Sequence, residues 1–482
     1  MGEEQGEGVS VVSRQTSAIA CPQDSAGRPG DGGPDAPAPS WCKPDAGVGP
    51  SGCHPRVGVA LRARRLIASL LLVVGVMQPA LADKLLIPMD LTQTDHLKAY
   101  GVVYWALQRQ VPCEWLLNYR GGSFMMDYGG VVALEAQVRG VRTQQISSAQ
   151  AAQIYSTIER ENMEVIRLDK APRIAVYTPP NKQPWDDAVT LALAYAEIDY
   201  TTLWDAEVLA GQLKNYDWLH LHHEDFTGQY GRFYISYHSA PWYQQQKAEY
   251  ERAARSLGFS KVSEYKKAVA RAIKAYVMEG GFLFAMCSAT DTIDIALAAQ
   301  DIDITAAICD GDGTTPNYNE RLDFSKTMAF YNFRLEENIW VYEFSDIDTY
   351  PERVANPRGP EADFFTLFNF SAKFSPVESM LTQDHVDHVK GFLGQTVGFH
   401  RRVIKPSVVI MGEAEGVDEV KYIHGNVGRG TFTFLGGHDP EDYQHVVGDP
   451  PTDLSFHRNS PGYRLILNNV LFPAARKKEQ KT

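Results

Sequence analysis

Residues 171–300 alternate between short apolar runs and longer runs in which apolar residues recur with helical spacing. The short runs predict buried strands, and the longer ones predict helices, the second of which stops at Gly280 and Gly281. Alternating strands and helices are typical of a parallel sheet that is covered on both faces. The expected strands are 174–177, 200–204, 218–222 and 282–287, and the expected helices are 186–198, 243–280 and 290–299.

The same pattern returns near the carboxyl end of the chain. Strands are expected at 408–410 and 430–435, and a last helix at 463–471. Residues 301–404 are less regular, with Gly and Asp turns, a Pro-rich loop and candidate hairpins. We therefore expect one α/β core built from 171–300 and 405–475, interrupted at 301–404 by an insertion or lid-like region.

Residues 83–170 predict a separate α/β segment. Apolar runs at 84–89 and 113–119 predict strands, and helices are expected up to about residue 110 and over 146–161. Thr94 or Asp95 would cap the first helix.

The amino-terminal pattern is of a different kind. Residues 62–82 combine a basic start, an apolar run and an Ala-Leu-Ala ending, which predicts a secretory signal peptide and a periplasmic or extracellular protein. The apolar run is shorter than the roughly 20 residues that span a bilayer. Residues 1–61 are rich in Gly, Pro, Ala and Ser, so we expect them to be disordered, and Met1 need not be the true start.

The amino-acid composition limits the classes of binding partner that we expect. Asp and Glu outnumber Lys and Arg by 59 to 46, and no basic stripe is present, so nucleic acid is not an expected partner. We expect a small-molecule ligand or substrate and no membrane association after signal cleavage, while the oligomeric state is not fixed by the sequence. After residue 82 only Cys113, Cys287 and Cys309 remain, and an odd number excludes a fully paired disulfide framework.

The first candidate for chemistry is Cys287, which lies where an apolar strand meets a helix, between the small residues Ala285 and Ala289. A nucleophile on such a turn is presented beside the helix amino terminus, whose amides and dipole favour a thiolate. A buried structural cysteine is the competing interpretation.

The second candidate is His438, which follows two glycines at the end of the strand 430–435. In open α/β sheets ligands bind at the carboxyl ends of the strands. An imidazole with a nearby carboxylate, here Glu441, is what a thiol nucleophile needs as its base. Alternatively, His438 only satisfies a turn.

The third candidate is the pair His220 and His222, which share one face of a strand because side chains alternate along it. Such a pair could ligate a divalent metal, the one cofactor that the sequence suggests, with His223, Glu224 or Asp225 nearby. The alternative is that both imidazoles are hydrogen-bonded in the core.

The order of these elements resembles the class I glutamine amidotransferase-like fold, including the related trehalose-utilisation (ThuA-like) proteins. The likeness covers 173–300 and 408–472 and implies a flavodoxin-like parallel sheet. It further implies Cys287 as nucleophile, His438 as base and Glu441 as the residue that orients it.

The chain also resembles exported bacterial proteins named asparagine synthetase B, through stretches such as LLIPMDLTQTDHLKAYGVVYWAL and FAMCSATDTIDIALA. Its motifs do not support that chemistry, because position 2 is Gly rather than Cys and no Ser-Gly-Gly-x-Asp-Ser loop is present. We expect a cysteine hydrolase that acts on an amide or a related small-molecule bond. The alternatives are a non-catalytic ligand-binding module and a metal-dependent hydrolase that uses His220 and His222.

Overall fold

The computed structural model describes residues 83–180, 187–446 and 448–476. All described residues belong to one compact unit. The expectations for 1–61 and for the signal peptide at 62–82 lie outside the described residues. Within the described ranges, no helix is long and apolar enough to cross a membrane.

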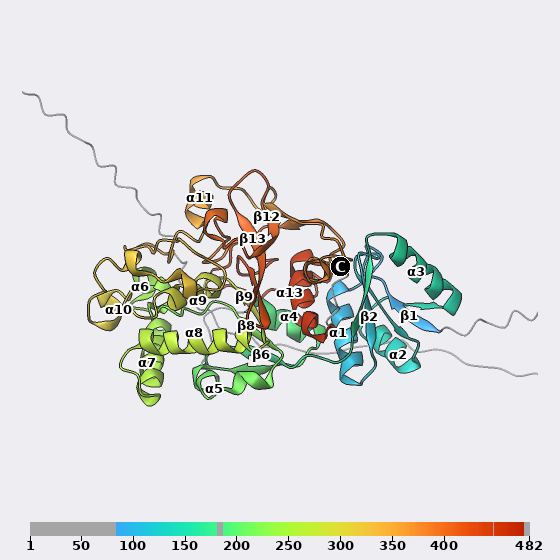
Figure 1. Ribbon diagram of the computed structural model, residues 1–482, viewed down its shortest axis with the longest axis horizontal. Coiled ribbons are helices and arrows are strands. Elements are labelled where there is room, and N and C mark those ends of the chain that lie inside the picture. Colours follow the sequence, from blue (N-terminus) through green and yellow to red (C-terminus); the bar gives the residue numbers. More distant parts are fainter. Residues whose placement is uncertain (1–82, 181–186, 447, 477–482) are drawn as a thin grey trace, which may run out of the picture. The chain divides into compact units, whose positions relative to one another are not determined.

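Residues 83–170 form an antiparallel five-stranded sheet in the order β4-β1-β3-β2-β5 (Figure 1). Asp95 caps the first helix, as predicted, by accepting a hydrogen bond from the Lys98 amide. The β3 strand was not predicted, and it pairs with both β1 and β2. The elements are β1 (Lys84–Ile87), α1 (His96–Gln108), β2 (Cys113–Leu117), β3 (Ser123–Asp127), α2 (Gly130–Val138), β4 (Gln144–Ile146), α3 (Ser148–Arg160) and β5 (Glu164–Leu168).

The larger sheet has nine strands in the order β11-β10-β12-β13-β14-β9-β8-β6-β7. The five strands from β14 to β7 are parallel, whereas β11, β10, β12, β13 and β14 pair antiparallel. The protein is therefore a mixed α/β structure. Its strands are β6 (Ile174–Tyr177), β7 (Thr201–Leu203), β8 (Trp218–Leu221), β9 (Phe282–Met286), β10 (Phe364–Leu367), β11 (His388–Lys390), β12 (Val409–Glu413), β13 (Val420–Val427) and β14 (Gly430–Leu435).

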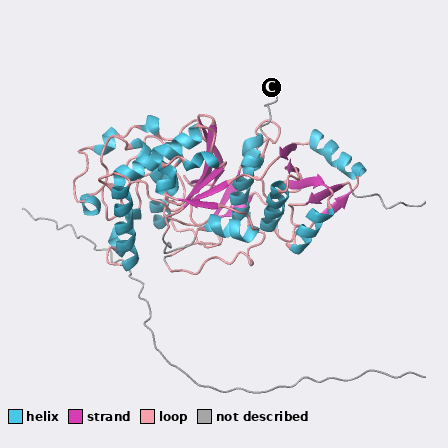
Figure 2. Ribbon diagram, turned by 90° about the horizontal axis from the view of Figure 1, so that it is seen from below, coloured by secondary structure: helices cyan, strands magenta, loops and turns pink. Residues whose placement is uncertain are grey.

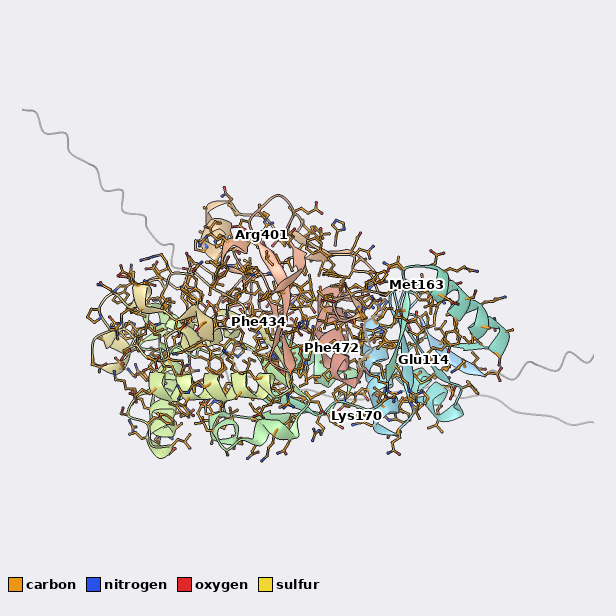
Figure 3. The ribbon with its side chains drawn as sticks, viewed as in Figure 1. Glu114, Met163, Lys170, Arg401, Phe434 and Phe472 are labelled. Carbon is orange, nitrogen blue, oxygen red and sulfur yellow. The ribbon has the colours of Figure 1, made fainter. Side chains whose placement is uncertain are left out.

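Helices cover both faces of the parallel strands (Figures 1 and 2). In β9, Phe282, Phe284 and Met286 join a core with α4, α13 and α1, and Leu283 and Ala285 join a second core with α8 and α9. In Figure 3, Phe472 marks the first core and Phe434 the second. The remaining helices are α4 (Ala188–Ala196), α5 (Asp205–Leu209), α6 (Tyr234–Tyr237), α7 (Pro241–Ser256), α8 (Val262–Met278), α9 (Ala289–Ala298), α10 (Ala307–Asp310), α11 (Tyr350–Ala355), α12 (Pro376–Leu381) and α13 (Pro461–Leu471).

Residues 301–404, expected as an insertion or lid-like region, are partly integrated into the sheet. They supply β10 and β11, which form its antiparallel edge, and Phe365, Val389 and Phe392 of this segment join the first core. Other residues of the same segment reach the carboxyl ends of the parallel strands, where the candidate site lies.

Candidate metal centre and adjoining cavity

The candidate site forms where the parallel strands β6, β8, β9 and β14 end. Asp187 begins the helix after β6, His220 lies in β8, and His222 follows β8 directly. Cys287 follows β9, and His438 follows β14 after two glycines. The carboxyl ends of parallel strands meet at one edge of the sheet, which is where ligands bind in open α/β folds.

Cys287 occupies the turn between β9 and α9 with a left-handed backbone (φ = 51°), a conformation that disfavours side-chain-bearing residues. Its N–H donates to the carbonyl oxygen of Gly437 at 3.1 Å, and the thiol is buried. Burial raises the pKa of the Cys287 thiol to about 11, although hydrogen bonds from the backbone amides of Gln395, Ser288 and Thr396 act to lower it. At neutral pH the group is therefore a thiol.

His438 is presented by a turn that requires glycine before it. Gly437 has φ = 96°, and a Cβ there would meet the Phe392 ring at 2.4 Å. The His438 amide donates to the Leu393 carbonyl at 2.9 Å, and the imidazole is buried. Neither nitrogen of the ring has a hydrogen-bond partner in the part of the chain that the structure describes. These two nitrogens are thus available for a ligand.

Three imidazoles converge on one point. His222, His223 and His438 each offer a nitrogen, and these atoms all lie within 4.8 Å of one another. The His438 ring centroid is 4.5 Å from that of His222 and 4.3 Å from that of His445. Burial, together with the neighbouring imidazoles, holds the pKa of His438 and of His223 well below the usual value. The rings of His223 and His438 are therefore neutral at physiological pH, which is the state in which imidazole binds metals.

A second group of possible ligands shares His222. Asp187 Oδ2 lies 3.3 Å from His220 Nε2, and Asp187 Oδ1 lies 3.4 Å from His222 Nδ1. The same Oδ1 accepts hydrogen bonds from the Val189 and Thr190 amides, so Asp187 also caps α4. The two predicted metal ligands, His220 and His222, thus meet at one carboxylate.

A cavity of about 290 Å³ opens beside this cluster. His223, His438 and Cys287 form part of its wall, and none of the described residues that line it is Lys, Arg, Asp or Glu. The segment 301–404 contributes Tyr342, Tyr350, Leu393, Gly394 and Gln395. The other lining residues are Phe233, Ile235, Ser236, Tyr237, Gln444, His445 and Val446. The described wall of the cavity is therefore built from aromatic, aliphatic, amide, thiol, hydroxyl and imidazole side chains.

The structure does not bring Glu441 to His438. The Glu441 carboxylate pairs with His457 Nδ1 at 2.9 Å and lines a different cavity. Its amide donates to Asp439 Oδ1 at 2.8 Å, and this tight turn separates it from the imidazole. The orienting role implied for Glu441 has no support in these contacts.

Sequence reasoning missed Asp187, His445 and Asp442. His445 Nδ1 lies 2.8 Å from Asp442 Oδ2, and His445 lines the cavity. The signals that could have found them were the position of Asp187 after a predicted strand and the three-residue spacing of Asp442 and His445. Glu224, considered near the histidines, instead lies 3.5 Å from Lys266 Nζ.

Comparisons with known proteins give little further information. No protein-family model matches the chain, and no curated protein matches it. Two solved cytoplasmic proteins of Salmonella typhimurium, STM3548 and STM1381, are similar over 63% of this chain and 100% of their own, at 13% and 11% identity and TM-scores of 0.31 and 0.32. The GH42 β-galactosidase Gan42B is similar over 56% of this chain and 28% of its own, at 7% identity and a TM-score of 0.23. Similarities this weak support no inference about function.

Proposed function

We propose that this protein is a metal-dependent hydrolase whose ion is held by His222, His223 and His438. The observation that carries the proposal is the convergence of their three nitrogens within 4.8 Å. His222 and His438 have ring nitrogens with no hydrogen-bond partner among the described residues. Buried polar atoms are normally satisfied, so unpartnered nitrogens that face each other favour a bound cation.

Three imidazole nitrogens as ligands favour zinc as the bound ion. Neutral imidazoles are preferred zinc ligands, and three of them with an open fourth position are typical of catalytic zinc sites. In this assignment His222 binds through Nε2, because its Nδ1 faces Asp187. A carboxylate behind a ligating histidine fixes the ring orientation and strengthens the donor.

The order of the parallel strands supports the fold that we propose for this site. Numbered along the chain, β7-β6-β8-β9-β14 is the order 2-1-3-4-5. That order is typical of flavodoxin-like sheets. With Cys287 on the turn after the fourth strand, it agrees with the proposed class I glutamine amidotransferase-like core.

His445 is the residue best placed to move protons. Its Nδ1 faces the Asp442 carboxylate, which leaves Nε2 as the acceptor, and the residue lines the cavity. The metal would supply a bound water with a pKa near 7 and polarise the substrate carbonyl. With the ion bound, His445 would accept a proton from the attacking water as the water oxygen bonds to the carbonyl carbon, and would return it to the leaving nitrogen or oxygen as the acyl bond breaks.

The cavity points to a small uncharged amide or ester as substrate. Its described lining has no charged side chain that would pair with an ionic substrate. Phe233, Tyr342 and Tyr350 provide aromatic surface, and Gln395 and Gln444 provide polar groups.

The test is metal content and activity measured on the same samples. Purified protein should contain zinc by elemental analysis, and chelation should abolish hydrolysis of a panel of neutral amides and esters until zinc is restored. His223→Ala and His438→Ala should each lose the ion held by the three histidines, together with the activity. His424→Ala is the matched control, because His424 is buried like His438 but lies in β13, where it contacts Thr433. A zinc content equal to that of wild type in both site variants would refute the proposal.

A cysteine hydrolase is the second candidate, favoured by the left-handed backbone of Cys287 at a strand-to-helix turn. Backbone amides around the sulfur could stabilise an oxyanion once the thiolate attacks a carbonyl carbon. The thiol proton would pass to His438 and then to the leaving group. In that case Cys287→Ala would abolish activity, whereas chelation would not.

A further inference from the structure

We propose that the centre is dinuclear, with a second divalent cation bound by Asp187, His220 and His222, and with His222 bridging the two ions. This inference rests on the proposed function, because the first ion is the one held by His222, His223 and His438. The second group is compact, since its three ligand atoms also lie within 4.8 Å of one another, and His220 and His222 are buried while Asp187 is half-buried.

The hydrogen bonding of His220 provides the first argument. Its Nδ1 lies 3.2 Å from the carbonyl oxygen of Phe284, and a carbonyl oxygen only accepts, so Nδ1 carries the proton. In a neutral ring, Nε2 then has a lone pair. That lone pair faces Asp187 Oδ2, another acceptor, at 3.3 Å. Two acceptors that face each other at this distance are stabilised by a cation between them, which is either a shared proton or a metal ion.

The distances provide the second argument. A proton shared by a buried carboxylate and an imidazolium gives a charge-assisted hydrogen bond of about 2.7–2.9 Å. Ligands about 2.0–2.1 Å from a tetrahedral zinc ion lie roughly 3.3–3.4 Å from one another. The contacts of Asp187 with His220 and His222 are 3.3 and 3.4 Å. They match the edges of a coordination tetrahedron and exceed the length of a charge-assisted hydrogen bond.

The two ligand groups overlap only at His222. We assign its Nδ1, which lies 3.4 Å from Asp187 Oδ1, to the second ion and its Nε2 to the ion shared with His223 and His438. Binding through both nitrogens requires the ring to lose its N–H proton, which passes to solvent as the second ion binds. The shared imidazole couples the two ions. The ion held by Asp187 and His220 orients the His222 ring, which also binds the ion beside the cavity.

Metal stoichiometry tests the inference. Chelated full-length protein titrated with Zn²⁺ should bind two equivalents, and His220→Ala and Asp187→Asn should each bind one. His438→Ala should retain only the ion held by Asp187, His220 and His222, and His222→Ala should lose both ions. One equivalent in wild type, unchanged in His220→Ala, would overturn the dinuclear proposal and leave the proposed function intact. Loss of metal only in His220→Ala and Asp187→Asn would instead refute the proposed function.

A spectroscopic measurement separates a bridge from two independent sites. Two Cu²⁺ ions joined through one imidazolate couple magnetically, so the EPR intensity of the Cu²⁺-loaded protein should fall well below that of two isolated ions. His220→Ala loaded with one equivalent should regain the full signal of a single ion. A wild-type spectrum that equals the sum of two isolated ions would overturn the bridging role of His222. Asp187→Asn also alters the cap of α4, so thermal unfolding of metal-free protein should be recorded for each variant.

Discussion

The backbone N–H of Cys287 donates a hydrogen bond to the carbonyl oxygen of Gly437 at 3.1 Å. This contact joins the turn after β9 to the turn after β14. Among the described residues it is the one main-chain hydrogen bond between Cys287 and Gly437. His438 follows Gly437 directly, and Cys287 and His438 both line the same cavity. The position of His438 thus depends on the backbone of Gly437.

Gly437→Ala should destabilise the protein and weaken metal binding. At φ = 96° a side chain costs about 1–2 kcal/mol. The new Cβ would also meet the Phe392 ring at 2.4 Å, and overpacking of this kind costs about 1–3 kcal/mol. The free energy of unfolding from urea denaturation and the zinc affinity measure the two effects.

Gly448→Ala is the matched control for this substitution. Gly448 has nearly the same φ, 98°, but a Cβ there would meet nothing within 4 Å. It should therefore lose only the backbone contribution and keep its zinc affinity. Equal losses of stability in the two variants would mean that the contact with Phe392 has no energetic weight.

Alkylation of Cys287 should be slow at neutral pH and should accelerate about tenfold for each pH unit. Burial raises the pKa of the thiol to about 11, and only the thiolate reacts. Iodoacetamide labelling between pH 7 and 9.5, with Cys287 followed by peptide mass mapping, gives the profile. Cys309 is the internal reference, because burial raises its pKa to about 12. A plateau of Cys287 labelling below pH 8 would favour the cysteine hydrolase over the metal-dependent one.

The parallel half of the larger sheet could be predicted from the sequence because most of its strands are buried runs rich in apolar residues. Phe282–Met286 is one such run, buried throughout. The antiparallel edge could not be predicted in the same way. His388–Lys390 exposes two of its three residues, and its place is set by pairing with Phe364–Leu367, which is distant in the chain.

The residues of the candidate site likewise fall into those that the sequence predicted and those that it did not. His220, His222, Cys287 and His438 were predicted because each belongs to or closely follows an apolar strand. Asp187 was not, because its contact with the histidines depends on how α4 packs against the sheet. Glu441 was assigned to His438 because it is close in the sequence and because the resemblance to the amidotransferase-like fold implied it. The local turn directs its carboxylate to His457 instead.

Asp291→Asn should make stability less dependent on pH. Burial raises the pKa of Asp291 from 3.8 to about 7, although a hydrogen bond from Thr396 opposes the shift. Between these two values the unfolded chain releases the proton while the folded protein keeps it, so wild-type stability falls as the pH rises. Because one pKa unit is worth about 1.4 kcal/mol, the loss is at most about 4 kcal/mol. Asparagine resembles the protonated acid and avoids this loss.

The free energy of unfolding of wild type and Asp291→Asn should therefore be compared at pH 5 and pH 8. Other buried carboxyl groups titrate in both proteins, so the difference between the two isolates Asp291. The variant should gain stability relative to wild type by at least about 1 kcal/mol between pH 5 and pH 8, a difference well resolved by paired denaturant curves. An unchanged difference at the two pH values would show that Asp291 is ionised in the folded protein throughout this range. In that case its hydrogen bond with Thr396 would outweigh the cost of burying the charge.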